Sequence, residues 1–154
     1  MTEPTIVKVS TYIAHFLKIK EIHTIFELQG GMITRILDEI SKTGGVKIVS
    51  MHHEQAAAFA ADAFARITGK PGVALATSGP GATNLITGIG SCFFDSVPAI
   101  FITGQVNLNE QKGSNPTRQI GFQETDIVSM ATPVTKKAFA VKTGQEIPAI
   151  FEEA

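Results

Sequence analysis

The stretch 72–106, GVALATSGPGATNLITGIGSCFFDSVPAIFITGQV, decides the fold class. Two of its parts, 72–79 and 97–106, are nearly continuous apolar runs that predict strands. Between them, 80–94 is typical of a helix that starts at a glycine and whose small residues let it lie close to a sheet. Strands that are apolar on both faces indicate a parallel sheet covered by helices on both sides. The stretch therefore predicts a strand–helix–strand unit of an α/β protein.

The same alternation continues on both sides of this stretch. Toward the N-terminus we expect strands within 23–31 and at 46–51, and helices at 5–17 (opened by Pro4), 33–41 and 54–67. Toward the C-terminus we expect a mobile loop at 107–121, a short helix at 122–132, a last strand at 136–142 and a helix at 144–154. The alternation predicts a doubly wound parallel sheet with helices on both faces, in a single α/β domain spanning 1–154.

Composition narrows the range of partners. The net charge is -1 and no like-charged run reaches five residues, which argues against nucleic acid or an anionic membrane as partner. Only 18% of the residues are charged and 44% are hydrophobic, so we expect other protein to cover part of the surface, as in a homo-oligomer. No signal peptide or membrane-spanning run is evident, and the single Cys92 favours a buried structural thiol. These features predict a cytoplasmic protein.

Four stretches follow the predicted strands, and ligands bind beyond the carboxyl ends of strands in open parallel sheets. They are Gly30 with Gly31, His53 with Glu54, 77–81, and 104–106. The glycine pair by itself is typical of a turn, and 78–84 matches neither G-x-G-x-x-G nor a P-loop, so phosphate binding has weak support. The histidines at 52 and 53 lack companion ligands at metal-site spacing, and we expect no metal site in this chain.

Glu54 stands at the start of a predicted helix whose residues 56–61 are all apolar. A favourable interaction with the helix dipole is the simpler explanation for a carboxylate there. However, the alanine and phenylalanine run is typical of a buried helix, and the first turn has little polar side chain to keep the carboxylate hydrated. A carboxylate in such a place can hold or share a proton near neutral pH, which suits a proton relay.

Several motifs together carry a resemblance to a known family. They are His-Glu-Gln (53–55), Gly-Lys-Pro-Gly (69–72), Thr-Ser-Gly-Pro-Gly-Ala-Thr-Asn (77–84), Asp-Ser-Val-Pro (95–98) and Thr-Gly-Gln-Val (103–106). In this order and spacing the chain resembles the pyrimidine-binding (PYR) domain of thiamine diphosphate enzymes, most closely that of the acetolactate synthase group. The resemblance runs from about residue 5 to the end and includes GFQETDIV (121–128) and TPVTK (132–136). It implies the PYR-type fold, as an N-terminal fragment of a larger transferase or lyase.

The resemblance also implies roles for single residues. Glu54 is then the catalytic residue: it hydrogen-bonds the N1′ atom of the cofactor's aminopyrimidine and favours its imino tautomer, which starts decarboxylation of a 2-oxo acid such as pyruvate. The other cofactor-binding positions implied are Gly30, Gly31, Thr77, Pro80, Gly81 and Asn84. Phe122 and Gln123 match a Phe-Gln pair at the substrate pocket.

The chain departs from the acetolactate synthase pattern beside the implied substrate pocket. Leu28 and Gln29 stand where Tyr-Pro is usual, Asn107 stands where proline is usual, and the loop 109–124 is longer. These departures leave a 2-oxo acid decarboxylase, or a carboligase with another acceptor, as an alternative. A non-catalytic assembly or regulatory module is a further alternative, against which Glu54 argues; the incomplete glycine motif argues against a nucleotide-binding domain.

The Gly-Asp-Gly motif, with which this family holds Mg²⁺ and the diphosphate, does not occur in the 154 residues. The resemblance therefore implies that a diphosphate-binding domain, usually from a partner subunit, completes the site and carries the Mg²⁺. FAD in the acetolactate synthase group is held mainly by a middle domain, so flavin remains possible for the full enzyme. We expect this chain alone to be inactive.

Overall fold

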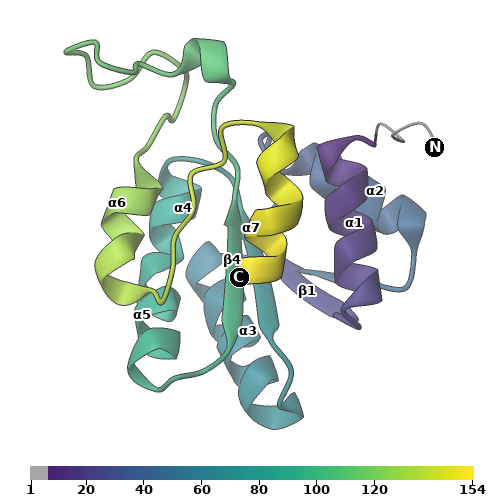
Figure 1. The fold of residues 1–154 in the computed structure, drawn as a ribbon. Coiled ribbons are helices and arrows are strands. Elements are labelled where there is room, and N and C mark those ends of the chain that lie inside the picture. Colours follow the sequence, from purple (N-terminus) through teal and green to yellow (C-terminus); the bar gives the residue numbers. More distant parts are fainter. Residues whose placement is uncertain (1–6) are drawn as a thin grey trace.

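A four-stranded, entirely parallel sheet forms the centre of the computed structural model, which describes residues 7–154 (Figure 1). Its strands are β1 (Thr24–Glu27), β2 (Lys47–Ser50), β3 (Gly72–Ala76) and β4 (Ala99–Thr103), in the spatial order β2-β1-β3-β4. Ile25 pairs with Ile48, Phe26 with Ala74, and Val73 with Ile100. Because all strands are parallel, their carboxyl ends meet at one edge of the sheet.

Helices cover both faces of this sheet. On one face, α1 (Val9–Ile19), α2 (Thr34–Thr43) and α7 (Ile147–Glu153) contribute to a core of branched aliphatic side chains. On the other, α3 (Glu54–Thr68) and α5 (Ile86–Phe94), which follows the short α4 (Pro80–Asn84), contribute to a core in which alanines predominate. The doubly wound α/β fold predicted from the sequence is confirmed.

The residues of β3 explain why the two faces differ. All five are buried, and their side chains alternate: Val73 and Leu75 belong to the aliphatic core, while Ala74 and Ala76 belong to the core under α3. Small residues let α3 approach closely, because a Cβ atom at Gly72 would collide with the backbone carbonyl of Ala61. This close packing fixes the position of α3, the helix that begins with Glu54.

The alanine-rich α3 is buried along one side only. Ala57, Ala58, Ala61 and Ala65 are buried, but Ala56, Phe59 and Ala63 are exposed, so the expectation that the whole run is buried was wrong. The side of such a helix that faces the core cannot be predicted from the sequence, because apolar residues on all sides give no hydrophobic periodicity. The helix ends at Thr68, one residue beyond the expected end, and its C-cap Gly69 has a left-handed φ of 69°.

Three other expectations differ from the structure. The strand expected at 136–142 does not form: within the described residues this segment pairs with no strand, and none of its side chains is buried. The helix expected at 122–132 is only α6 (Ile127–Ala131), because Gln123 has a φ of 64° and Asp126 caps the helix start by accepting from the Ser129 N–H. The helix expected at 80–94 is interrupted at Leu85.

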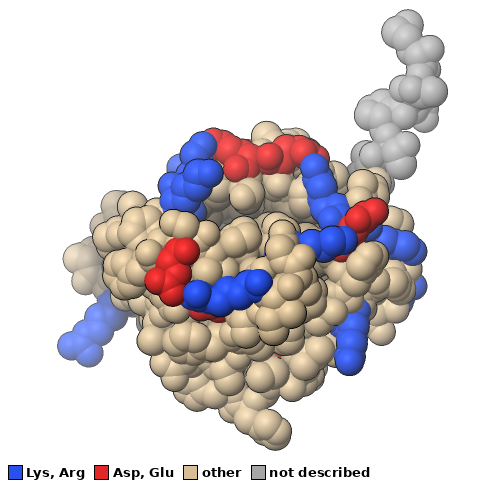
Figure 2. Space-filling model, turned by 90° about the horizontal axis from the view of Figure 1, so that it is seen from below, with Lys and Arg blue, Asp and Glu red and all other residues tan. Residues whose placement is uncertain are grey.

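The remaining connections contain three short 3₁₀ helices: η1 (Leu108–Glu110), η2 (Thr132–Val134) and η3 (Gly144–Glu146). The expected helix start at Pro4 and Thr5 lies outside the described residues, and α1 is described from Val9. Seen from below, lysines and arginines alternate with acidic residues, and neither charge gathers on that face (Figure 2). Within residues 7–154 no helix has both the length and the apolar character that crossing a membrane requires.

Candidate functional site

The loops at the carboxyl edge of the sheet contact one another. A Cβ atom at Gly30, after β1, would collide with the side chain of Thr77, after β3. The Met32 N–H donates to Thr77 Oγ1 at 3.4 Å, and a Cβ atom at Gly104, after β4, would collide with Met32. The loops after β1, β3 and β4 therefore form a continuous rim, to which α3 adds Glu54 from the end of β2.

Glu54 is the first residue of α3, and its side chain is buried, with 7% of the residue exposed. Its Oε2 atom accepts a hydrogen bond from the Asn84 side-chain amide at 2.9 Å. No hydrogen bond from any described residue reaches its Oε1 atom. The structure thus brings Glu54 and Asn84 together, 30 residues apart in sequence, and leaves one carboxylate oxygen available as an acceptor.

A tight turn at 77–81 borders this carboxylate. Gly79 has a φ of 65°, and Pro80 occupies the first turn of α4. A Cβ atom at Gly81 would lie 2.8 Å from Thr77 Cγ2 and 3.2 Å from Glu54 Oε1, so a larger residue here would fill the space beside the carboxylate. The glycine at 81 therefore keeps room next to Glu54 Oε1.

Phe122 and Gln123 lie in different surroundings at this rim. Gln123 packs against the turn, since a Cβ atom at Gly79 would lie 2.7 Å from Gln123 Cβ. Phe122 is 74% exposed and forms no part of the contacts around Glu54. Gly31 likewise has open space at its Cα atom. The structure therefore joins Gly30, Glu54, Thr77, Gly81, Asn84 and Gln123 and leaves Phe122 and Gly31 at the surface.

His53 has a structural role that the sequence reasoning missed. It is the N-cap of α3, and its Nδ1 atom accepts a hydrogen bond from the Gln55 N–H at 3.1 Å. Its place directly before the first helical residue was the available signal, although histidine is an uncommon cap. Among the described residues, no group of three or more His, Cys, Asp or Glu side chains could hold a metal ion.

Glu27 is a second buried carboxyl near the rim that the sequence reasoning missed. It ends β1 and is 1% exposed, and its Oε1 atom accepts a hydrogen bond from the Ser50 hydroxyl at the end of β2. Its Oε2 atom has no partner in the described part of the chain. The available signal was an acidic residue inside an apolar strand, where a charged side chain is rare.

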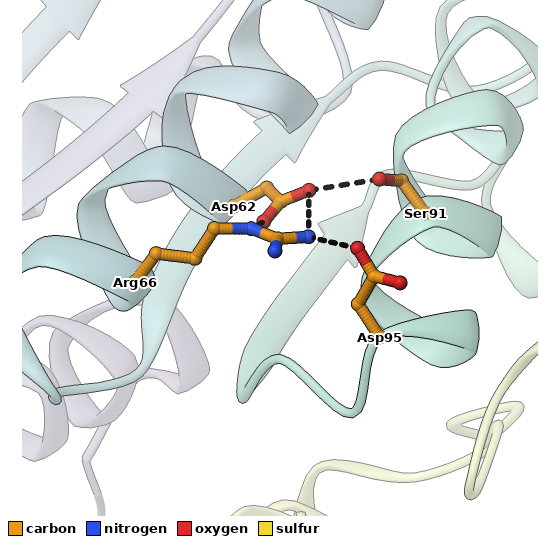
Figure 3. Close-up of polar contacts among 4 residues, drawn as sticks. All are labelled: Asp62, Arg66, Ser91 and Asp95. Atoms are coloured by element: carbon orange, nitrogen blue, oxygen red, sulfur yellow. Dashed lines mark hydrogen bonds and ion pairs between the residues drawn. The ribbon is translucent and has the colours of Figure 1, made fainter.

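A polar network joins the far ends of α3 and α5 (Figure 3). Asp62, on the buried side of α3, accepts hydrogen bonds from Arg66 and from the Ser91 hydroxyl at 2.9 Å, and Arg66 also pairs with Asp95 at 2.6 Å. The hydrogen bond from Arg66 holds the pKa of the Asp62 carboxyl below its ordinary value, although burial opposes the shift. Nearby, burial raises the pKa of the Cys92 thiol to about 11, so this cysteine stays protonated at neutral pH.

Comparison with known proteins agrees with this geometry. The sequence matches the family described as thiamine pyrophosphate enzyme, N-terminal TPP binding domain, over residues 7–130. The acetolactate synthase large subunit of Buchnera aphidicola subsp. Schizaphis graminum is 44% identical over 133 residues, which cover 86% of this chain and 22% of that protein. The acetolactate synthase isozyme 2 large subunit of Escherichia coli is 42% identical over 143 residues, covering 93% and 25% respectively.

The chloroplastic acetolactate synthase of Arabidopsis thaliana is 42% identical over 136 residues, covering 86% of this chain and 19% of the plant protein. The chain thus spans about a fifth to a quarter of the length of these relatives. The family resemblance predicted from the motifs is confirmed, and with it thiamine diphosphate (thiamine pyrophosphate) as the cofactor of the domain. The chain belongs to the thiamine pyrophosphate enzyme family, as an N-terminal TPP-binding domain.

Proposed function

We propose that this chain is the pyrimidine-binding part of a thiamine diphosphate carboligase that acts on a 2-oxo acid such as pyruvate, as the name of its acetolactate synthase relatives suggests. One observation carries the proposal. The Glu54 carboxylate is buried, one of its oxygens is held by Asn84, and the other accepts nothing from the described residues. A single acceptor oxygen in an apolar surrounding suits one ring nitrogen of an aminopyrimidine.

In this proposal Glu54 Oε1 would form the hydrogen bond to the pyrimidine N1′ atom, with one proton shared between the two atoms. Burial strengthens this bond because little water competes for the oxygen. The Asn84 amide keeps the carboxylate from rotating, so the free oxygen has a fixed direction. The cofactor, when bound, would supply a thiazolium ring that serves as the sink for the electron pair released when the 2-oxo acid loses carbon dioxide.

The other cofactor-binding residues in the proposal are Gly30, Gly31, Thr77, Pro80, Gly81 and Asn84. Support for Gly81 is the room that its missing Cβ leaves beside Glu54 Oε1. Support for Thr77 is its contact with both Gly30 and Gly81, which places it between two loops of the rim. Phe122 and Gln123 are assigned to the substrate pocket, where exposed Phe122 is available to contact a substrate or a second domain.

The proposal assigns Mg²⁺ and the diphosphate to a diphosphate-binding domain of a partner subunit, and FAD, if present, to a middle domain. It makes 1–154 a single PYR domain of a cytoplasmic homo-oligomer that binds neither nucleic acid nor membrane. Support for a covered surface comes from the large apolar side chains exposed on α3 and α5, namely Phe59 (41%), Phe93 (45%) and Phe94 (75%). By itself the chain is inactive in this scheme.

The test uses the full-length protein with thiamine diphosphate, Mg²⁺ and pyruvate. Carbon dioxide release with formation of acetolactate supports the proposal. Release of acetaldehyde instead supports the decarboxylase alternative, which the departures at Leu28, Gln29 and Asn107 leave open. If the protein neither binds the cofactor nor releases carbon dioxide, the proposed catalytic function is wrong and the alternative of a non-catalytic module is supported.

A further inference from the structure

The arm, residues 107–121, leaves the end of β4 and projects from the body of the protein above α4 and α6 (Figure 1). Its two limbs are joined by hydrogen bonds. The Gly121 N–H donates to the Glu110 carbonyl at 2.8 Å, and the Lys112 side chain donates to the Thr117 carbonyl at 3.2 Å. At its start, Asn107 and Glu110 form a capping box around η1. The arm is therefore a folded unit with its own internal bonds.

One carboxylate, Glu124, binds both limbs of the arm. Its Oε1 atom accepts from the Lys112 N–H at 2.8 Å, and its Oε2 atom accepts from the Ile120 N–H at 3.0 Å. Both bonds are made by a charged acceptor, which strengthens them relative to bonds between neutral groups. The hydrogen bonds from Ile120 and Lys112 lower the pKa of Glu124, so the carboxylate is ionised at neutral pH.

Gln123, directly before Glu124, lies against the candidate site. Its φ of 64° is left-handed, which few residues other than glycine adopt without support from their surroundings. The support comes from several sides: Gly79 packs against its Cβ atom, and the Thr125 hydroxyl donates to its carbonyl at 3.3 Å. The Gln105 amide in turn donates to the Thr125 carbonyl at 2.7 Å.

The Gln123 side chain is half-buried, and its amide forms no hydrogen bond with any described residue. The turn against which it packs, 77–81, is the one that borders Glu54. The NH₂ group of a free amide at this place can donate to a substrate carbonyl or carboxylate.

We propose that Glu124 is a positioning residue: by binding both limbs of the arm, it sets the direction of the neighbouring Gln123 amide at the substrate end of the site. The inference rests on the proposed function. Glu124 itself touches no substrate in this scheme. It acts through Gln123, the residue directly before it, by holding the arm to which this segment is joined.

The experiment uses the full-length protein with thiamine diphosphate and Mg²⁺, and the variant Glu124→Gln. The amide keeps the size of the side chain but replaces one acceptor oxygen with a donor, so one of the two backbone bonds is lost. We expect amide hydrogen exchange at Lys112 or Ile120 to accelerate about tenfold, as the loss of one hydrogen bond to a charged group implies. We also expect KM for pyruvate to rise about tenfold with little change in kcat, because substrate positioning and not the chemical step is affected.

Glu146→Gln is the control for the loss of the charge. Glu146 also accepts two backbone hydrogen bonds, from Lys142 at 2.9 Å and Thr143 at 3.4 Å, but both are made to Oε2, so the amide oxygen of glutamine can keep them; the residue lies at η3 before α7. This variant should leave KM unchanged. In both variants, cofactor affinity measured by calorimetry should equal that of the parent.

Two results would overturn this inference but leave the proposed function standing. The first is an unchanged KM in Glu124→Gln while exchange at Lys112 or Ile120 accelerates. The second is an equal rise of KM in both variants, which would mean a general loss of stability. If the parent protein does not bind thiamine diphosphate, both the proposed function and the inference are wrong. This outcome is distinguishable from the first two because it is seen in the parent protein, before any substitution is made.

Discussion

Replacing Asp62 by asparagine tests how α3 is held against α5. Asp62 has 4% of its surface exposed and accepts hydrogen bonds from the Nε and Nη2 atoms of Arg66 and from the Ser91 hydroxyl. Asparagine keeps one acceptor oxygen but turns the other into a donor that faces Arg66 or Ser91. We therefore expect Asp62→Asn to unfold at a lower urea concentration than the parent chain.

The structure limits the size of this effect. A fully buried ion pair that loses one partner costs about 3–5 kcal/mol. Here Arg66 is 45% exposed and keeps its bond to Asp95, so its charge remains solvated and paired. The estimate for the substitution is therefore about 2 kcal/mol of unfolding free energy, the range for hydrogen bonds to a charged group.

The effect should depend on pH in a defined direction. Because the folded pKa of Asp62 is below its ordinary value of 3.8, the ionised carboxylate stabilises the folded state. The difference in stability between parent and Asp62→Asn is then fully present above that ordinary value. It is lost as the pH falls through the lowered pKa, where Asp62 is protonated in both the folded and the unfolded chain.

Asp38→Asn is the control for this measurement. Asp38 and Lys42 form the same i,i+4 pair of opposite charges on α2, but their side chains are 54% and 63% exposed. Exposed pairs of this kind contribute little to stability, so the urea midpoint should hardly move. Equal shifts for Asp62→Asn and Asp38→Asn, or a difference between parent and Asp62→Asn that grows on acidification, would refute the reasoning.

Three further predictions concern the site and the surface. In the full-length enzyme, Glu54→Gln should slow exchange of the cofactor C2 proton, followed by NMR, by roughly a hundredfold or more, while cofactor binding weakens only modestly. Exchange at the parental rate would show that the role proposed for Glu54 is wrong. The isolated 154-residue chain should show little or no heat of binding with thiamine diphosphate and Mg²⁺ in calorimetry, whereas micromolar binding would mean that the diphosphate is anchored here. The same chain should sediment as a homodimer at about tens of micromolar, and a monomer would contradict an interface through α3 and α5 of ordinary affinity.

The layered fold was predictable because its strands are apolar on both faces. The apolar run that forms the fully buried β3, with glycines at the ends of the neighbouring segments, is typical of a central strand of a parallel sheet. The strand expected at 136–142 was not predictable in the same way. Strand formation there depends on pairing with an edge of the sheet, which local composition does not specify, and the segment instead connects η2 to η3 without a partner.

Within the candidate site, motifs were easier to foresee than conformations. The sequence indicated Glu54 and Asn84 through the family motifs, and the structure joins them by a hydrogen bond. It did not indicate that Gln123 is left-handed, because glutamine carries no preference for that conformation and Gln123 packs against Gly79, a residue of a distant segment. The sequence also did not indicate the unpartnered Oε2 atom of Glu27, because its burial results from the packing of the sheet.

Three contacts hold α3 and the Glu54 carboxylate at its start, and one of them is made to the carboxylate itself. His53 caps the helix on which Glu54 stands, Asn84 binds one carboxylate oxygen from α4, and Asp62 ties the same helix to α5 further along. A group whose position is fixed before a ligand arrives loses little entropy on binding and needs little reorganisation during reaction. Because Asn84 binds Oε2 and leaves Glu54 Oε1 unpartnered among the described residues, the fold of this chain by itself presents this acceptor oxygen.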